Sequence, residues 1–483
     1  MQAFQQNRIF LASVVVLLAV MAWMMVVSVR DESQTWDEAI HISAGYSYWK
    51  TGDYRLNTEH PPLAKLLVAI PLLWMDLRFP AEHPSWAVAD EVEFGRQFLY
   101  HNTVPADIIL FRARQMMIGL TLLFGACFAF WARRIFGVLV ALTALALFCF
   151  EPTIIAHGRY ATTDLAIAFF SFLAVTAWFS WLKHGGWVRL LWAGTALGLA
   201  MASKFSWPFL LPVFILAAII VRAKPLRAAS GIAVAIITGC AVVAVAYAPV
   251  AHQLIPATRS YRAAHPEVKF LGADLALNEI QSGFSKFAIT LAPKLGLQPH
   301  PYLMGLLRGA SDNQAGHDSY LLGMVSEQGW WYYFPVAFLV KEPTGLLLGI
   351  LAALVVGVAL GWRGENSRML WLALGTIVIY LAIVISVHIN IGIRHLLPIL
   401  PFVHILVAGV LWPRWRIALG VFELLVVAET SLQHPYYLPF FNMLVGGPAN
   451  GSKYLVDSNL DWGQDFKRLK AWAVAHQGES DLC

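Results

Sequence analysis

The chain of 483 residues is 58% hydrophobic and only 13% charged, with a mean hydropathy of +0.62. This composition excludes a soluble globular protein and predicts an all-α polytopic membrane protein. The net charge of +5 does not indicate a nucleic-acid partner, because much of the basic excess falls in short loops between apolar runs. Cys127, Cys149 and Cys240 fall within apolar runs and Cys483 is the last residue, so neither a disulfide framework nor a thiolate metal site is indicated.

About eleven membrane-spanning helices are predicted from the apolar runs. The first, residues 9–29, has no charge between Arg8 and Arg30 and is long enough to cross a hydrocarbon core. A cleaved signal peptide is the alternative, but the length of the run and the lack of an A-x-A-like site favour a retained helix. The other ten spans are expected at about 110–132, 135–150, 163–182, 189–203, 205–221, 228–249, 333–361, 369–387, 396–412 and 416–433.

The short loops on the side of the N-terminus carry basic residues, such as Arg133, Arg134, Arg222, Arg227, Arg414 and Arg416. The positive-inside rule therefore predicts that this side is cytoplasmic. The opposite side then holds two long loops, about 30–109 and 250–332, which we expect to carry interfacial helices. We expect residues 1–433 to form the transmembrane core and residues 434–483 to form an extracytoplasmic C-terminal segment.

Two acids, Asp37 and Glu38, follow the first span by a few residues. At this depth a partly dehydrated carboxylate can have a raised pKa and take a proton from an attacking hydroxyl. Solvated loop acids are the alternative interpretation of both. Trp36 before the pair and His41 after it favour a functional role for Asp37.

A turn at Glu59, His60 and two prolines stops any preceding helix, because proline restricts the residue before it and has no N–H to donate. Residues 63–75 are apolar apart from Lys65 and too short to span, so we expect them in the interface with Lys65 near the lipid phosphates. A snorkelling lysine is the alternative. Glu59 and His60 are candidate metal ligands, but two ligands do not define a metal site. The sequence therefore predicts no cofactor firmly, and a bound divalent cation remains an alternative.

Further charges fall on the outer face. Arg159 and Asp164 lie at the start of the fourth span, where an acid can also act only as a helix cap or dipole partner. Lys204 lies in a short outer link, against the positive-inside trend, and Arg394 with His395 closes another outer link. A phosphate held at the interface needs such cations, because an unpaired anion in a low dielectric is costly.

Each of these cations also has an ordinary interpretation. Lys204 can be a snorkelling lysine and Arg394 a plain helix-end cation. Lys341, close to a predicted span, can pair with its neighbour Glu342 and is kept as a candidate ligand only.

Taken together, this layout resembles the polytopic C-type glycosyltransferases that use polyprenyl-phosphate-linked sugars, including the protein O-mannosyltransferases and the lipid A aminoarabinose transferases. The matching features are the acids after the first span, the Glu59 to Pro62 turn with Lys65, and Asp164. A bacterial branch of phospholipid-carrier-dependent glycosyltransferases is similar at residues 330–335 (WWYYFP), 390–395 (NIGIRH), 446–448 (GGP) and 457–465 (DSNLDWGQD).

The resemblance implies transfer of a hexosyl or pentosyl group from a polyprenyl phosphate to a hydroxyl of a protein, lipid or glycan, with inversion. It implies that the reaction takes place among membrane lipids, on the extracytoplasmic side of a bacterial inner membrane. The implied catalytic residues are Asp37 as general base, with Glu38 and Asp164 as further candidates. The implied phosphate ligands are Arg394 and Lys204, followed by Arg159 and Lys65, and the remaining candidates are Glu59, His60, His395 and Lys341.

The chain departs from this pattern at two places. Aminoarabinose transferases tend to have a lysine where this chain has His60, which argues against a direct phosphate contact there. Relatives commonly continue beyond the position of Cys483, so we expect a truncated chain.

Two other function classes compete with the enzyme. A transporter of a lipid-linked or small polar substrate should place ionisable residues near the bilayer midplane on broken helices, whereas most acids here gather at one face. If the chain is instead a structural or assembly subunit, Asp37 has no role in proton transfer.

Overall fold

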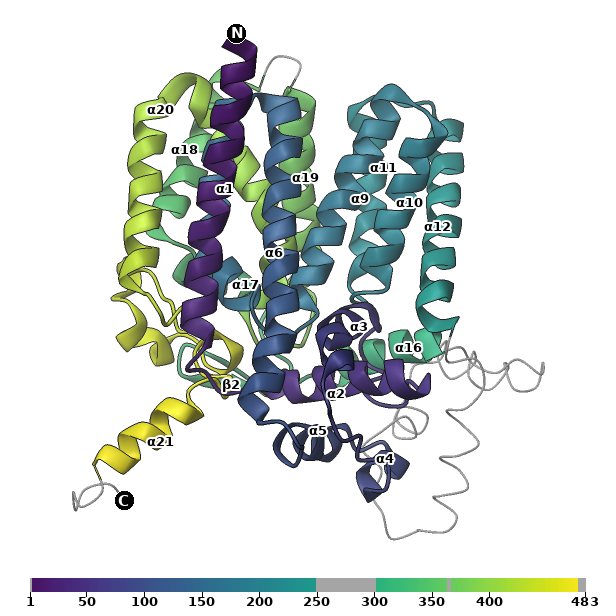
Figure 1. Cartoon of the computed structure of the whole chain (residues 1–483). Helices are drawn as coiled ribbons and strands as arrows, with labels where there is room; N and C mark the ends of the chain where they lie inside the picture. Colours follow the sequence, from purple (N-terminus) through teal and green to yellow (C-terminus); the bar gives the residue numbers. More distant parts are fainter. Residues whose placement is uncertain (1, 249–300, 363–365, 477–483) are drawn as a thin grey trace.

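The computed structural model describes residues 2–248, 301–362 and 366–476. Long helices lie side by side in a bundle, and a layer of short helices lies across one end of it (Figure 1). The first described residues lie at the far end of the bundle, and the last described residues lie beyond the layer of short helices. Most of the second predicted outer loop, together with Cys483, lies outside the described residues.

The bundle is built from apolar helices. They are α1 (Gln2–Val29), α6 (Ala106–Phe136), α7 (Val138–Cys149), α9 (Asp164–His184), α10 (Trp187–Met201), α11 (Leu210–Ile220), α12 (Pro225–Tyr247), α17 (Tyr333–Lys341), α18 (Thr344–Leu360), α19 (Ser367–Val384) and α20 (Leu400–Leu432).

The remaining elements are short and connect or cap these helices. They are α2 (Trp36–Thr51), α3 (Leu63–Ala69), η1 (Ile70–Trp74), α4 (Pro84–Val88), α5 (Glu91–Tyr100), α8 (Pro152–His157), η2 (Trp207–Phe209), α16 (Pro301–Ala315), β1 (Ser319–Leu321), β2 (Met324–Ser326), η4 (Ile393–Ile399), η5 (Met443–Val445), η6 (Pro448–Lys453), η7 (Asp457–Asn459) and α21 (Phe466–Ala475). β1 and β2 form an antiparallel hairpin in which Tyr320 pairs with Val325.

The helical, polytopic class predicted from the sequence is confirmed, and the chain is an integral membrane protein. Within the described residues, six helices are long and apolar enough to cross a membrane, or seven if one bent pair counts as a span. The predicted count of about eleven is therefore not confirmed. Several predicted spans correspond to helices that are shorter than a hydrocarbon core, such as α7, with 12 residues, and α11, with 11.

One predicted boundary differs from the structure for an identifiable reason, and another agrees with it. Residues 333–361 were expected as one span, but α17 and α18 meet at 114°, because Pro343 excludes the preceding residue from the α region. Residues 396–412 and 416–433 were expected as two separate segments, and the structure breaks α20 into two helices between them. The break lies at Trp415, which has non-helical φ/ψ of −130° and 39°, two residues after Pro413. Gly349 of α18 lies against both Val407 and Phe422, so the two parts of α20 run side by side.

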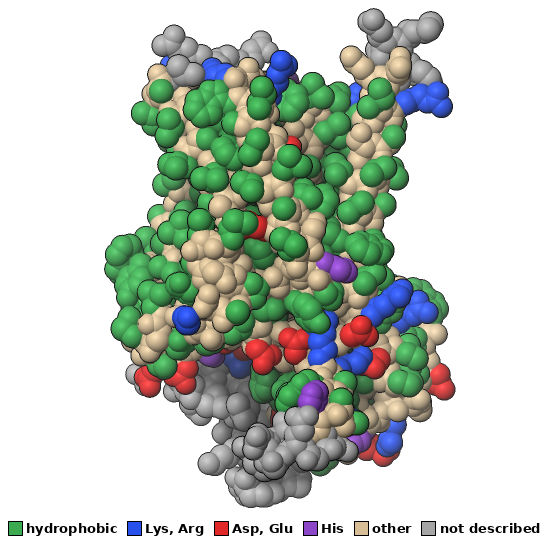
Figure 2. Space-filling view, turned by 90° about the vertical axis from the view of Figure 1, so that its left-hand side faces the viewer, with side chains coloured by type: hydrophobic (Ala, Val, Ile, Leu, Met, Phe, Trp, Pro, Cys, Tyr) green, Lys and Arg blue, Asp and Glu red, His purple; other side chains and the backbone are tan. Residues whose placement is uncertain are grey.

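On the face shown in Figure 2, apolar side chains cover the bundle between two ends that carry charged side chains. Large apolar side chains such as Val15, Val245 and Val358 are exposed on α1, α12 and α18. Because such a surface would aggregate in water, it is the surface that contacts lipid.

The layer at the end of the bundle positions the site. At the start of α2 the Glu38 carboxylate accepts a hydrogen bond from the backbone N–H of Thr35 (2.8 Å), which satisfies one of the free donors of the helix. Further along, α3 crosses α2 closely at Gly45, where a Cβ would lie 2.0 Å from the carbonyl oxygen of Lys65. Any other residue at position 45 would push the two helices apart.

Candidate active site

Four charged side chains from distant parts of the chain meet at the boundary between the bundle and the layer of short helices. Arg394 Nη1 donates to Asp37 Oδ2 at 2.7 Å and lies 3.4 Å from Asp164 Oδ2. Asp164 also pairs with Lys204. We call Asp37, Arg394, Asp164 and Lys204 the acid–base network. Its members come from the first turn of α2, from η4, from the first residue of α9 and from the link after α10.

The members of the network differ in their access to solvent. The side chain of Asp37 is 19% exposed and that of Lys204 16%, whereas Asp164 is only 2% exposed. Asp164 therefore pairs with Arg394 and Lys204 on the buried side of the network. Asp37 and Lys204 lie on the side that solvent reaches. The Nε of Arg394 is buried without a hydrogen-bond partner among the described residues. A buried donor without an acceptor is costly, so this N–H is available to an anionic ligand.

Trp462, in the segment 457–465, packs on the guanidinium of Arg394, with 4.2 Å between Cζ and the ring centroid. The carbonyl oxygen of Trp462 accepts a hydrogen bond from the backbone N–H of Trp36 at 2.9 Å. The Asn459 side chain accepts one from the backbone N–H of Ile393 at 2.8 Å. The C-terminal segment therefore contacts both the start of α2 and η4, which carries Arg394. The sequence singled out this segment by resemblance but assigned it no role.

Glu38 lies next to Asp37 in sequence but is fully buried. Its two oxygens accept hydrogen bonds from Arg114 Nε at 2.8 Å and Nη2 at 2.6 Å. They also accept from the backbone N–H groups of Ala161 and Thr35. This saturated carboxylate joins α2, α6 and the segment before α9. The sequence interpretation missed Arg114, although an arginine inside a predicted span is a signal of a buried partner.

Arg159 is also fully buried, on the side of α1. It pairs with Glu32 at 2.9 Å and donates to Ser28 and to the Tyr160 hydroxyl. The Tyr160 hydroxyl in turn donates to Glu32 at 3.0 Å. The structure thus places Arg159 in a buried cluster separate from the acid–base network.

The turn at Glu59 and His60 lies against α2, because the rings of His60 and His41 are 5.6 Å apart. Lys65 Nζ lies under this turn and donates to the Asn57 carbonyl (2.6 Å), the Asn57 side chain (3.1 Å) and the His60 carbonyl (2.7 Å). All three N–H donors of the ammonium form are therefore engaged by the turn itself.

Burial lowers the pKa of Lys65 to about 7 and holds the pKa of His60 well below its usual range. His60 is therefore neutral at physiological pH and contributes no charge toward a phosphate. Glu59 pairs with Arg308 at 3.3 Å. Among the described residues, no group of three or more His, Cys, Asp or Glu side chains is arranged to hold a metal ion.

The last two candidates are Lys341 and His395. Lys341 is buried at the bend between α17 and α18 and donates to the carbonyl oxygens of Leu438 (2.8 Å) and Asn459 (2.6 Å). The His395 ring stacks on Phe334 at 5.9 Å. Lys341 thus anchors the C-terminal segment, and His395 packs beside the network.

Comparison with known proteins points to one family. A family model described as dolichyl-phosphate-mannose-protein mannosyltransferase matches residues 12–253, a range that contains Asp37, Asp164 and Lys204. No curated protein sequence matches the chain.

Similar solved structures belong to membrane glycosyltransferases. The crystal structure of ArnT from Cupriavidus metallidurans bound to undecaprenyl phosphate matches with a TM-score of 0.52 at 13% identity. The match covers 85% of this chain, which spans 62% of the length of that ArnT chain. Because the sequence identity is low, this similarity is evidence for a shared fold only.

Two further structures are less similar. The Pmt1–Pmt2 protein O-mannosyltransferase complex of S. cerevisiae bound to its sugar donor has a TM-score of 0.36 and 19% identity, over 54% of this chain and 37% of that chain. The Archaeoglobus fulgidus oligosaccharyltransferase, in complex with Zn and sulfate, has a TM-score of 0.44 and 12% identity, over 91% of this chain and 53% of that chain.

Proposed function

The chain belongs to the dolichyl-phosphate-mannose-protein mannosyltransferase family, and we propose that it transfers a sugar from a polyprenyl-phosphate-linked donor to an acceptor hydroxyl, with inversion at the anomeric carbon. The observation that carries this proposal is the acid–base network, in which one arginine bridges two carboxylates and keeps a buried N–H unpaired. Such an arrangement suits an enzyme that must hold an anionic leaving group beside a proton acceptor.

Arg394 and Lys204 are the proposed ligands of the donor phosphate. Both are cations of the network, and Asp164 pairs with both. An arginine can donate to two phosphate oxygens at once, and the unpaired Nε supplies one of these donors. Arg159 and Lys65 are less suited to this role, because buried protein oxygens already engage them.

Asp37 is the proposed general base. While Arg394 donates to Asp37 Oδ2, that oxygen is engaged. Phosphate binding would draw the guanidinium toward the donor and release Oδ2. The carboxylate then takes the proton of the acceptor hydroxyl as the acceptor oxygen bonds to the anomeric carbon. The bond from that carbon to the phosphate oxygen breaks, and its electron pair leaves with the polyprenyl phosphate.

We propose that the site faces the extracytoplasmic side of a bacterial inner membrane, because the short loops at the opposite end of the bundle are basic. In a cysteine-free background, a cysteine at Glu327, after the exposed hairpin, should react with an impermeant thiol reagent in intact spheroplasts. A cysteine at His184, at the other end of α9, should not react. The reverse pattern would overturn the orientation.

The transferred group is proposed to be a hexosyl or pentosyl unit, and the acceptor a hydroxyl of a protein, lipid or glycan. The test is an assay of the purified full chain with defined polyprenyl-phosphate sugars and a panel of these acceptors. Transfer from at least one such donor, lost in Asp37→Asn, is expected. No transfer from any donor of this class, with intact folded protein, would contradict the proposal.

A further inference from the structure

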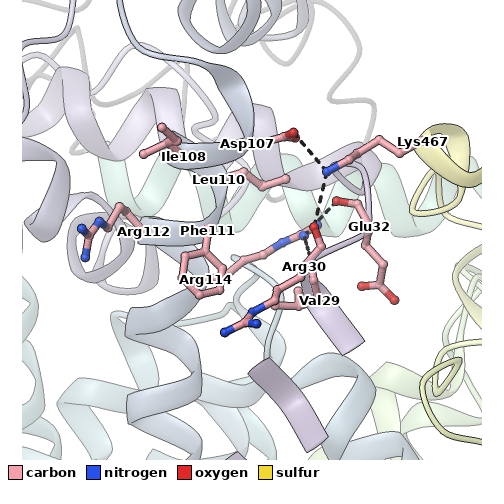
Figure 3. A pocket seen from close by; sticks show the side chains of 10 residues that line it. All are labelled: Val29, Arg30, Glu32, Asp107, Ile108, Leu110, Phe111, Arg112, Arg114 and Lys467. Carbon is pink, nitrogen blue, oxygen red and sulfur yellow. Dashed lines mark hydrogen bonds and ion pairs between the residues drawn. The ribbon is translucent and has the colours of Figure 1, made fainter. Parts of the chain in front are cut away.

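We propose that a second site, away from the acid–base network, binds the phosphate group of an anionic glycerophospholipid in the adjacent leaflet. The site is a cavity of about 390 Å³ between the end of α1, the start of α6 and α21. Figure 3 shows the side chains that line it. The cavity combines an apolar wall with cations that have no acidic partner, and it lies where lipid head groups lie.

Most of the charge around the cavity is already neutralised. Three ion pairs neutralise this charge. They are Arg114 with Glu38 at 2.6 Å, Glu32 with Arg159 at 2.9 Å, and Lys467 with Asp107 at 3.1 Å. These lining residues therefore contribute little net charge to the space between them.

Two lining arginines remain without an acidic partner. Arg30 and Arg112 are exposed, and neither forms an ion pair in the part of the chain that the structure describes. The only side-chain hydrogen bond of Arg112 seen there goes to Gln115, at 3.3 Å. In the view of Figure 3, the ring of Phe111 lies between the two arginine side chains, apart from the Lys467–Asp107 pair. Arg30 and Arg112 thus place two positive charges without acidic partners at the cavity, one on either side of Phe111 (Figure 3), and cations of this kind suit a phosphate.

The depth of the two arginines suits a lipid head group. Arg30 follows directly on the apolar span Gln5–Val29. α6 has 31 residues and is therefore about 46 Å long, whereas a hydrocarbon core is roughly 30 Å thick. Arg112 lies in the second turn of this helix, close to the end of the bundle at which Arg30 follows α1.

The wall beside these cations is apolar. Val29, Ile108 and Phe111 line the cavity, and the Ile108 side chain is 48% exposed. A free anion in water would gain nothing from this wall, whereas the acyl chains of a lipid would cover it. The two cations and the wall together therefore fit a lipid that carries a phosphate.

The cavity is separated from the proposed chemistry by protein. The buried Glu38–Arg114 pair stands between the cavity and the start of α2. A lipid bound there would stabilise the junction of α1 and α6 behind Asp37 without contacting the reacting atoms.

The test measures binding of short-chain phosphatidylglycerol to the purified full chain by native mass spectrometry in mild detergent. Phosphatidylcholine of the same chain length, inorganic phosphate and undecaprenyl phosphate serve as comparison ligands. We expect phosphatidylglycerol to bind most tightly. Arg30→Gln and Arg112→Gln should each weaken its binding by about tenfold or more, because each removes a charge-assisted contact.

Matched variants separate binding from folding. Arg30→Lys and Arg112→Lys keep the charge and should retain most of the affinity, and Arg78→Gln, at an exposed arginine of the first long loop, should change nothing. Unchanged binding in both glutamine variants would overturn the proposal. Equal binding of phosphatidylcholine or inorganic phosphate, or tighter binding of undecaprenyl phosphate at this site, would overturn the choice of ligand.

Discussion

Asp37 and Glu38 are neighbours in sequence and occupy opposite environments. The Asp37 carboxylate contacts one guanidinium and is 19% exposed, whereas Glu38 is fully buried and accepts hydrogen bonds from Arg114 and two backbone N–H groups. The same contrast separates Arg394, which has an unpaired Nε, from Arg159, whose partners surround it. Charged groups of one kind thus divide into the acid–base network, which we propose to be the reactive set, and a structural set.

The division has a physical reason. A polytopic protein must hold the ends of its helices together in a low dielectric, and saturated ion pairs can do this only if every donor and acceptor is matched. A catalytic set must instead keep some donors and acceptors incompletely matched, because the substrate supplies the remaining partners. The unpaired Nε of Arg394 therefore distinguishes this arginine from the fully engaged Arg159, which charge and position in the sequence do not.

The largest effect is expected from Asp37→Asn. This variant keeps the shape of the side chain but cannot take a proton, so turnover should fall by about 10²–10⁴. Folding and donor binding should persist, because the phosphate is held by cations. Turnover is measured with saturating donor and acceptor. Near-normal turnover would remove Asp37 from the mechanism.

Glu38→Gln tests the structural member of the same pair. It leaves Arg114 as an uncompensated buried charge, which should cost on the order of 3–5 kcal/mol of stability. The measurement is thermal unfolding in detergent, with Asp37→Asn as the matched control that should unfold near the wild-type temperature. Arg114→Met combined with Glu38→Leu should recover part of the loss. A fully stable but inactive Glu38→Gln would place Glu38 in the reactive set.

Measurements of donor binding should distinguish the cations that contact the donor phosphate from those that do not. Arg394→Ala or Lys204→Ala removes a charge-assisted phosphate contact and should weaken binding of the lipid-linked donor by on the order of 1.5–3 kcal/mol. Acceptor binding should change less, and Arg78→Ala, at an exposed arginine outside the network, is the control. If both network variants bind the donor as the wild type does, the phosphate lies elsewhere.

The smallest effect is expected from Trp462→Leu. Its ring packs on the guanidinium of Arg394, a contact worth about 0.5–2 kcal/mol. The variant should raise the KM for the donor several-fold with little change in unfolding temperature. Trp462→Phe keeps an aromatic face and should lose less. Equal losses in both variants would show that ring stacking does not position Arg394.

Membership of the network could be predicted in part from the sequence. Asp37, Asp164, Lys204 and Arg394 were all candidates, because alternating spans place their segments on one face. Their pairing could not be predicted, since it depends on how η4 packs beside α9. Arg159 and Lys65 carried the same sequence signal, and only their hydrogen-bond partners in the structure separate them from the network.

The fold shows the same limit. Hydropathy identified the apolar segments and the helical class, but it could not distinguish a helix that spans from one that is only buried. The bend before Pro343 had a local signal in the proline itself. The break in α20 had one too, because Pro413 and the basic residues around it indicate a turn between two helices.

The most direct test is a structure of the full chain bound to a non-transferable analogue of a polyprenyl-phosphate sugar. Our account predicts phosphate oxygens within hydrogen-bond distance of Arg394 Nε and Lys204 Nζ, with Asp37 released from Arg394 and facing the anomeric carbon. A phosphate bound away from both cations, with the Asp37–Arg394 pair intact, would contradict it.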